Sequence, residues 1–197
     1  MGQGKQAKVL RSRELQRLLD HVAHSRHRER DRAMVLLSFK AGLRAGEIAA
    51  LTWSMVMDAS GELADAISLP NKATKGKGGG RTIPLHSELR AALTSLKAVQ
   101  GVKVRPHLPV AYSERADGYS ANAVAVWFHT RYAELGIVGA SSHSGRRSFI
   151  TAAAKKISEA GGSLRDIQEL AGHSSLATTQ RYIQGETLAK RKVIDLI

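Results

Sequence analysis

Cysteine is absent from this chain of 197 residues, which excludes disulfides and thiolate metal sites and is typical of a protein from a reducing cytoplasm. No apolar run approaches the roughly 20 residues that a membrane-spanning helix needs. Residues 1–5 lack the apolar core of a secretory signal. We therefore expect a soluble, cytoplasmic protein that makes no contact with a membrane.

Acidic residues are also scarce. The 17 Asp and Glu are outnumbered by 30 Lys and Arg, so the formal net charge is +13 and the pI is near 10.4. An excess of this size attracts polyanions at ordinary ionic strength, and nucleic acid is the obvious one. The charge alone does not separate DNA from RNA. The length favours a single domain with one sizeable core.

Apolar residues recur at helical spacing over most of the chain. Ser12 is the expected cap of the first helix, Gly42 ends the second, and a short third helix is expected over 46–51. Further helices are predicted to begin at Ser87 and to cover 120–136, 145–160, 164–171, 176–183 and 187–197.

The pattern changes between residues 53 and 85. Three short β-like segments, 54–57, 66–69 and 81–85, are separated by turns that contain glycine. The expected fold class is therefore mainly α with a small three-stranded antiparallel β-sheet.

One block of eleven residues, 172–182, reads Gly-His-Ser-Ser-Leu-Ala-Thr-Thr-Gln-Arg-Tyr. Upstream, His143 and Arg146 are three residues apart at the start of a predicted helix, and Arg44 stands in Gly-Leu-Arg-Ala-Gly-Glu. A tyrosine hydroxyl is a poor nucleophile, because with a pKa near 10 only about one in a thousand is ionised at neutral pH. Cationic neighbours would help it, and arginine forks match the oxygens of a phosphodiester.

These residues resemble the catalytic domain of the tyrosine recombinases, the phage-integrase and Xer-like site-specific DNA recombinases. The resemblance runs from about Lys8 to the end of the chain. It implies the tyrosine-recombinase catalytic-domain fold, in which Arg44 and Arg146 clamp the scissile phosphate and Glu47 supports the site.

The same resemblance assigns the remaining chemistry. Tyr182 matches the nucleophile, His173 matches the histidine that precedes it by nine residues, and His143 would take or give protons. The family also places a general-acid lysine in a β-hairpin turn. The turn here has an unusual length, so we choose Lys75 and keep Lys77 as the alternative. The expected DNA contacts are Lys72, Lys77, Arg81 and Arg147.

The reaction that the resemblance implies is cleavage and rejoining of double-stranded DNA through a 3′-phosphotyrosine, in integration, excision or resolution. It needs no metal and no cofactor, because guanidinium groups neutralise the charge of the transition state. Exchange between two duplexes requires four active sites, which implies a tetramer on DNA. In the family a C-terminal helix contacts a neighbouring protomer, here through Val193, Ile194, Leu196 and Ile197; packing of that helix on its own domain is equally open.

The expected domain organisation is a flexible basic arm over residues 1–7 and a catalytic domain over 8–197. Most members of the family carry a further N-terminal DNA-clamping (core-binding) domain, which we expect this chain to lack. Gly145 and Arg147 stand where many members have a leucine and a histidine.

Other interpretations are weaker. Residues 163–183 also resemble a helix-turn-helix DNA reader, so a non-catalytic regulator is the alternative function. The glycine run lacks phosphate-loop spacing, and His21, His24 and His27 have no carboxylate or thiol set to complete a metal site. The joint presence of two distant arginines, two histidines and a tyrosine favours the enzyme.

Overall fold

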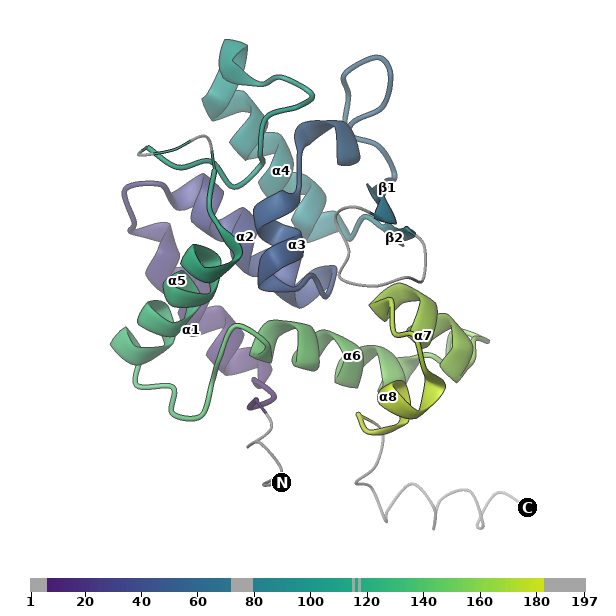
Figure 1. Cartoon of the computed structure of the whole chain (residues 1–197). Coiled ribbons are helices and arrows are strands. Elements are labelled where there is room, and N and C mark those ends of the chain that lie inside the picture. The colour runs from purple at the N-terminus through teal and green to yellow at the C-terminus, as the bar shows by residue number, and fades with distance from the viewer. Residues whose placement is uncertain (1–6, 72–79, 115, 117, 183–197) are drawn as a thin grey trace, which may run out of the picture.

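The computed structural model describes residues 7–71, 80–114, 116 and 118–182. The elements along the chain are labelled in Figure 1. They are α1 (Ser12–Ala23), α2 (Arg28–Lys40), α3 (Ala45–Ala50), η1 (Trp53–Met55), β1 (Ala66–Leu69), β2 (Arg81–Pro84), α4 (Ser87–Gln100), η3 (Gly101–Lys103), α5 (Ala121–Glu134), α6 (Ser144–Lys156), α7 (Leu164–Ala171) and α8 (Leu176–Gln180).

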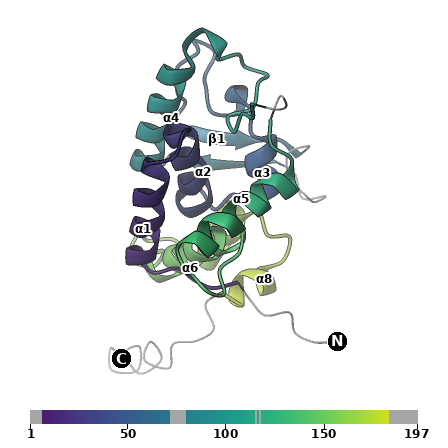
Figure 2. The same ribbon diagram turned by 90° about the vertical axis from the view of Figure 1, so that its left-hand side faces the viewer.

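Helix α2 is the centre of the main core. It packs against α1, α3, α4 and α6, and α3 in turn packs against α5. The apolar side chains of α2 are buried on all sides, which is the pattern of a helix enclosed by others. Figure 2 shows α1 and α4 on one side of this body and α3 and α5 on the other. The predicted helical segment that ends before Gly42 is thereby confirmed.

A second, smaller core joins α6, α7 and α8. Ile150, Ile167 and Ala171 are its buried residues, and Tyr182 packs against them. In Figure 1 helix α6 extends from the main body to α7 and α8. Helix α7 also contacts β2, so this C-terminal unit meets the hairpin as well as α6. The candidate tyrosine and the candidate arginines thus belong to different cores that touch.

The sheet differs from the prediction. Strands β1 and β2 pair antiparallel with Ile67 opposite Ile83, and the described part of the sheet has only these two strands. The predicted strand at 54–57 is wrong. Trp53 begins a 3-10 helix there, and Met57 forms only an isolated bridge with Leu63.

The reason lies in the spacing of the buried residues. Trp53 and Val56 are both fully buried and three residues apart, which is the period of a helical turn and not of a strand. The backbone N–H groups of Val56 and Met57 donate to the carbonyl of Trp53, so they are not free to extend the sheet. The indole N–H of Trp53 donates to Gln100 and anchors the turn on α4.

The helix ends follow local capping chemistry. Arg11, not the predicted Ser12, is the first cap residue, because the carboxylate of Glu14 accepts from the Arg11 N–H. The predicted bounds of α7 are confirmed, and Gly172 ends that helix with a φ of 60°.

The first described residues are tied to the body. The Lys8 N–H donates to the carbonyl of Gly139, and the buried Leu10 donates from its backbone to Ser148. The predicted domain start at residue 8 matches this attachment; residues 1–6 of the predicted arm lie outside the described part. No helix among the described residues is long and apolar enough to cross a membrane.

Candidate active site

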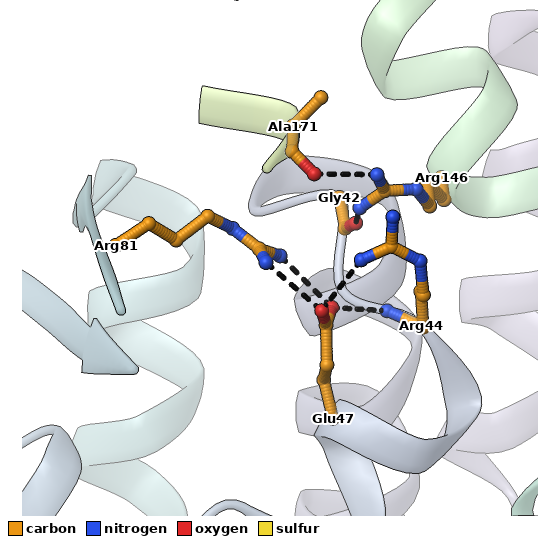
Figure 3. A network of polar contacts seen from close by, with 6 residues as sticks. All are labelled: Gly42, Arg44, Glu47, Arg81, Arg146 and Ala171. Carbon is orange, nitrogen blue, oxygen red and sulfur yellow. Dashed lines mark hydrogen bonds and ion pairs between the residues drawn. The ribbon is translucent and has the colours of Figure 1, made fainter. Parts of the chain in front are cut away.

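A buried carboxylate organises three arginines from different elements (Figure 3). Glu47 is the third residue of α3 and has 2% of its side chain exposed. It accepts from the Arg44 backbone N–H at 2.8 Å and from Arg44 Nη1 at 2.7 Å. Arg81, at the start of β2, donates from Nη1 and Nη2 to the two oxygens of Glu47, at 2.9 and 2.8 Å. This two-pronged geometry is the strong form of the arginine–carboxylate pair.

Glu47 remains ionised in this setting. Burial acts to raise the pKa of its carboxyl group, but the hydrogen bonds and charges of Arg81 and then of Arg44 outweigh burial and lower the pKa to about 2. Three guanidinium groups and one carboxylate leave this part of the site with a net charge of +2, once Arg146 is included. The surplus is suited to an anion.

Arg146 reaches the cluster from the first turn of α6. Its side chain is buried, and it donates from Nη1 to the carbonyl of Gly42 at 2.7 Å and from Nη2 to the carbonyl of Ala171 (Figure 3). Burial, followed by the charge of Arg44, lowers the pKa of Arg146 to about 9, so it stays a cation at neutral pH. Arg146 thereby joins the loop before α3 to the end of α7.

Two glycines allow α6 to approach this closely. A Cβ on Gly145 would collide with the hydroxyl of Ser38 and the ring of Phe39 on α2. Gly42 has a φ of 64°, and the ring of Phe149 covers it. The glycine that replaces the family's frequent leucine at position 145 is therefore required by packing, with Ser38 and Phe39 filling the space.

His173 follows the left-handed turn at Gly172. Its Nδ1 lies 2.9 Å from the hydroxyl of Thr179 on α8, and its backbone N–H donates to the carbonyl of Gln168. Burial, followed by the charges of Arg146, Arg44 and Arg81, lowers the pKa of His173 to about 4. The imidazole is therefore neutral at pH 7, and Nε2 is left to donate or accept one hydrogen bond.

Tyr182 is the last described residue and lies beside His173. The two rings stack with their centroids 5.6 Å apart and their planes inclined by 20°. The phenol is close enough to Arg146 to be among the groups that affect its pKa. Sequence positions 44, 146, 173 and 182 are thus brought together within one protomer.

Other predicted site residues are placed differently. His143 is the cap residue of α6, exposed, and its imidazole forms no hydrogen bond with the part of the chain that the structure describes. Arg147 donates to the carbonyl of Ala7 at 2.7 Å, on the N-terminal segment. Arg81, predicted to contact DNA, has its guanidinium group 8% exposed and occupied by Glu47. The remaining predicted residues lie outside the described ones: Lys72, Lys75, Lys77, Val193, Ile194, Leu196 and Ile197.

Two contributors were missed from the sequence. Thr179 holds the imidazole of His173, and Arg81 holds Glu47, where the sequence suggested only a DNA contact. Thr179 is three residues before Tyr182, on the same face of a helix, so the helical period offered a signal for it. Arg81 offered none, because its partner is 34 residues away in the sequence.

Comparisons with known proteins agree with this geometry. Residues 8–187 match the model of the phage integrase family. The chain is 34% identical over 169 residues to tyrosine recombinase XerC of Xanthomonas campestris pv. campestris (strain B100), which covers 84% of this chain and 48% of that protein. It is 28% identical over 205 residues to tyrosine recombinase XerD of Rickettsia conorii, covering 98% of this chain and 64% of that protein. The chain spans about half to two thirds of the length of these curated relatives.

Solved structures show the same fold. The XerA recombinase superposes with a TM-score of 0.72 at 25% identity, over 96% of this chain and 64% of that one. A lambda integrase dimer bound to a core site superposes with a TM-score of 0.68 at 18% identity, over 92% of this chain and 49% of that one. With the family model, the arginine cluster and the stacked His173 and Tyr182 all in agreement, the chain belongs to the phage integrase family and has the fold of a tyrosine recombinase catalytic domain.

Proposed function

We propose that this chain is the catalytic domain of a site-specific DNA recombinase that cleaves and rejoins strands through a bond between Tyr182 and a 3′ phosphate. The observation that carries the proposal is the stack of Tyr182 on His173 beside Arg146, in the same protomer as Arg44. A phenol in this position has the cationic neighbours that its attack on a phosphodiester needs.

The proposed step transfers one phosphoryl group. The Tyr182 hydroxyl loses its proton and its oxygen bonds to phosphorus, while the bond from phosphorus to the 5′ oxygen breaks. Arg44, whose side chain is 29% exposed, and Arg146 would balance the charge that develops on the phosphoryl oxygens. The neutral imidazole of His173 would add one hydrogen bond through Nε2.

The departing 5′ oxygen must gain a proton. Lys75 is the residue we propose for this, with Lys77 as the alternative, and His143 would exchange protons with solvent from the start of α6. The covalent bond keeps the energy of the broken one, so a 5′ hydroxyl from another strand reseals the DNA without ATP, metal or cofactor.

The partner we propose is double-stranded DNA that carries a specific recombination site. The net charge of +13 supports it, and related solved structures include XerH bound to difH and the Tn1549 integrase in complex with transposon right end DNA. Lys72, Lys77 and Arg147 are the proposed contacts. We propose a tetramer on DNA, with the tail residues Val193, Ile194, Leu196 and Ile197 between protomers. The DNA would be chromosomal, phage or mobile-element DNA in a prokaryotic cytoplasm, and the catalytic domain would extend over 8–197.

The helix-turn-helix alternative is not favoured. Helix α8 has five residues, which is short for a helix that reads a groove. The buried side of α7 carries Ile167 and Ala171 into the small core that also holds Tyr182. A DNA reader has no need for this tyrosine beside Arg146.

The test is trapping of the covalent intermediate. A pool of nicked duplexes with a randomised central sequence is incubated with the protein, and protein–DNA adducts are recovered under denaturing conditions and sequenced to define the site. On that site the wild type is expected to form an adduct that Tyr182→Phe does not form, while both bind DNA equally in a mobility-shift assay. Binding without any adduct from the wild type would reject the enzyme and favour a regulator.

A further inference from the structure

Arg81 makes two kinds of contact at once. Its Nη1 and Nη2 are both committed to Glu47, and its Nε is buried without a hydrogen-bond partner among the described residues. A buried donor without a partner costs stability, so an arginine kept in this place is not explained by stability alone.

The other contact is with the turn that leads to His173. A Cβ on Gly172 would lie 2.7 Å from Nη1 of Arg81 and 3.0 Å from its Cδ, so the side chain fills the space that a residue other than glycine would need. Arg81 therefore lies between the carboxylate that holds Arg44 and the turn that presents the candidate histidine.

The position of Arg81 in the sequence adds the third connection. It is the first residue of β2 and directly follows the stretch that contains Lys75 and Lys77. Strand β2 also packs against α7. The hairpin strand, the start of α3 and the α7–α8 turn are held in register by this one guanidinium group.

We propose that Arg81 is a positioning residue for strand cleavage, which ties β2 to Glu47 and to the Gly172–His173 turn so that Arg44 and His173 face one phosphate. The proposal rests on the proposed function. The planar fork of arginine is the essential property, because a lysine supplies one charge but cannot bind both oxygens of Glu47 while filling the space against Gly172.

Two variants separate charge from geometry. Arg81→Gln removes both, and Arg81→Lys keeps the positive charge and removes the fork. Arg165→Gln is the matched control, because Arg165 lies on the neighbouring helix α7 in an exposed pair with Glu169. Circular dichroism spectra establish that each variant is folded.

The first measurement does not depend on activity. The imidazole signal of His173, assigned by its loss in His173→Gln, is followed by NMR against pH. The charged groups that face this ring are Arg146 of α6, Arg44 at the start of α3 and Arg81 of β2, with the neutral hydroxyl of Thr179 from α8. Removing Arg81 takes away a repelling charge and loosens the turn, so the titration midpoint should move upward in Arg81→Gln. It should stay closer to the wild type in Arg81→Lys and be unchanged in Arg165→Gln.

The second measurement is the single-turnover rate of adduct formation on the identified DNA site. Both Arg81 variants should cleave about tenfold to a hundredfold more slowly, since a misplacement near 1 Å has an effect of that size. Their DNA affinity should be unchanged. If Arg81→Lys cleaves at the wild-type rate, or if Arg81→Gln leaves the His173 midpoint in place, the positioning role is overturned. If the wild type forms no adduct, the proposed function fails, and the His173 midpoint still reports whether Arg81 orders the cluster.

Discussion

The ring of Tyr182 stacks on the imidazole of His173, with their centroids 5.6 Å apart. Thr179 connects the pair, because its hydroxyl contacts Nδ1 of His173 and its carbonyl accepts from the Tyr182 N–H. The orientation of both rings therefore depends on one buried side chain at the third-last described turn position before the tyrosine.

Thr179→Val tests that dependence. The change keeps the shape of the side chain and removes the hydroxyl, so the imidazole loses its orienting partner. Single-turnover cleavage should fall about tenfold to a hundredfold with DNA affinity unchanged, and the free energy of unfolding should fall by about 1 kcal/mol. Thr178→Val, at the neighbouring position, should leave both quantities near the wild type. Equal cleavage by the two variants would show that Thr179 does not orient His173.

Glu47→Gln is predicted to destabilise the protein in a pH-dependent way. The pKa of Glu47 is about 2 in the folded protein and 4.5 in its absence, so the ion pair stabilises the fold above pH 4.5 and this contribution is lost as pH falls toward 2. The shift corresponds to about 3 kcal/mol at neutral pH. Urea unfolding at pH 7 and at pH 3 should show a large difference between wild type and variant at pH 7 and a smaller one at pH 3. A difference that is the same at both pH values would contradict the buried pair.

His173 contributes in a different pH window. Its pKa is lowered from 6.5 to about 4, so the unfolded chain takes up a proton that the folded protein refuses. Stability due to this group is complete above pH 6.5 and decreases as pH falls toward 4. In His173→Gln, the part of the acid-induced loss between pH 6.5 and 4 should be smaller, as measured by thermal unfolding at closely spaced pH values. An unchanged profile would mean that the imidazole is solvated and charged near neutrality.

Gly172→Ala and Gly136→Ala form a matched pair. Both glycines have a positive φ, 60° and 65°, and an alanine in this conformation costs about 1 kcal/mol. Nothing lies within 4 Å of a Cβ at Gly136, whereas a Cβ at Gly172 meets Arg81. Gly172→Ala should therefore lose about 1 kcal/mol more than Gly136→Ala in urea unfolding, and only Gly172→Ala should slow cleavage. Equal losses would show that Arg81 moves away freely.

Several features of the fold were predictable from local pattern alone. The bounds of α7 and β1 follow from apolar spacing and from the glycines and turns that flank them, because capping and turn chemistry act over a few residues. The strand predicted at 54–57 failed because Trp53 and Val56 turn toward the main core, and the position of that core is set by residues far away in the sequence.

The sequence by itself determined which residue types the site has: the spacing of His143 and Arg146 and the block ending in Tyr182 are local and identify the family. The tertiary structure alone decided that Arg81 faces Glu47 instead of the surface, and that α6 approaches α2 closely enough to require Gly145. The physical reason is that a charged side chain is as compatible with a buried pair as with solvent, and only the folded chain brings the 34-residue separation between Glu47 and Arg81 down to hydrogen-bond distance.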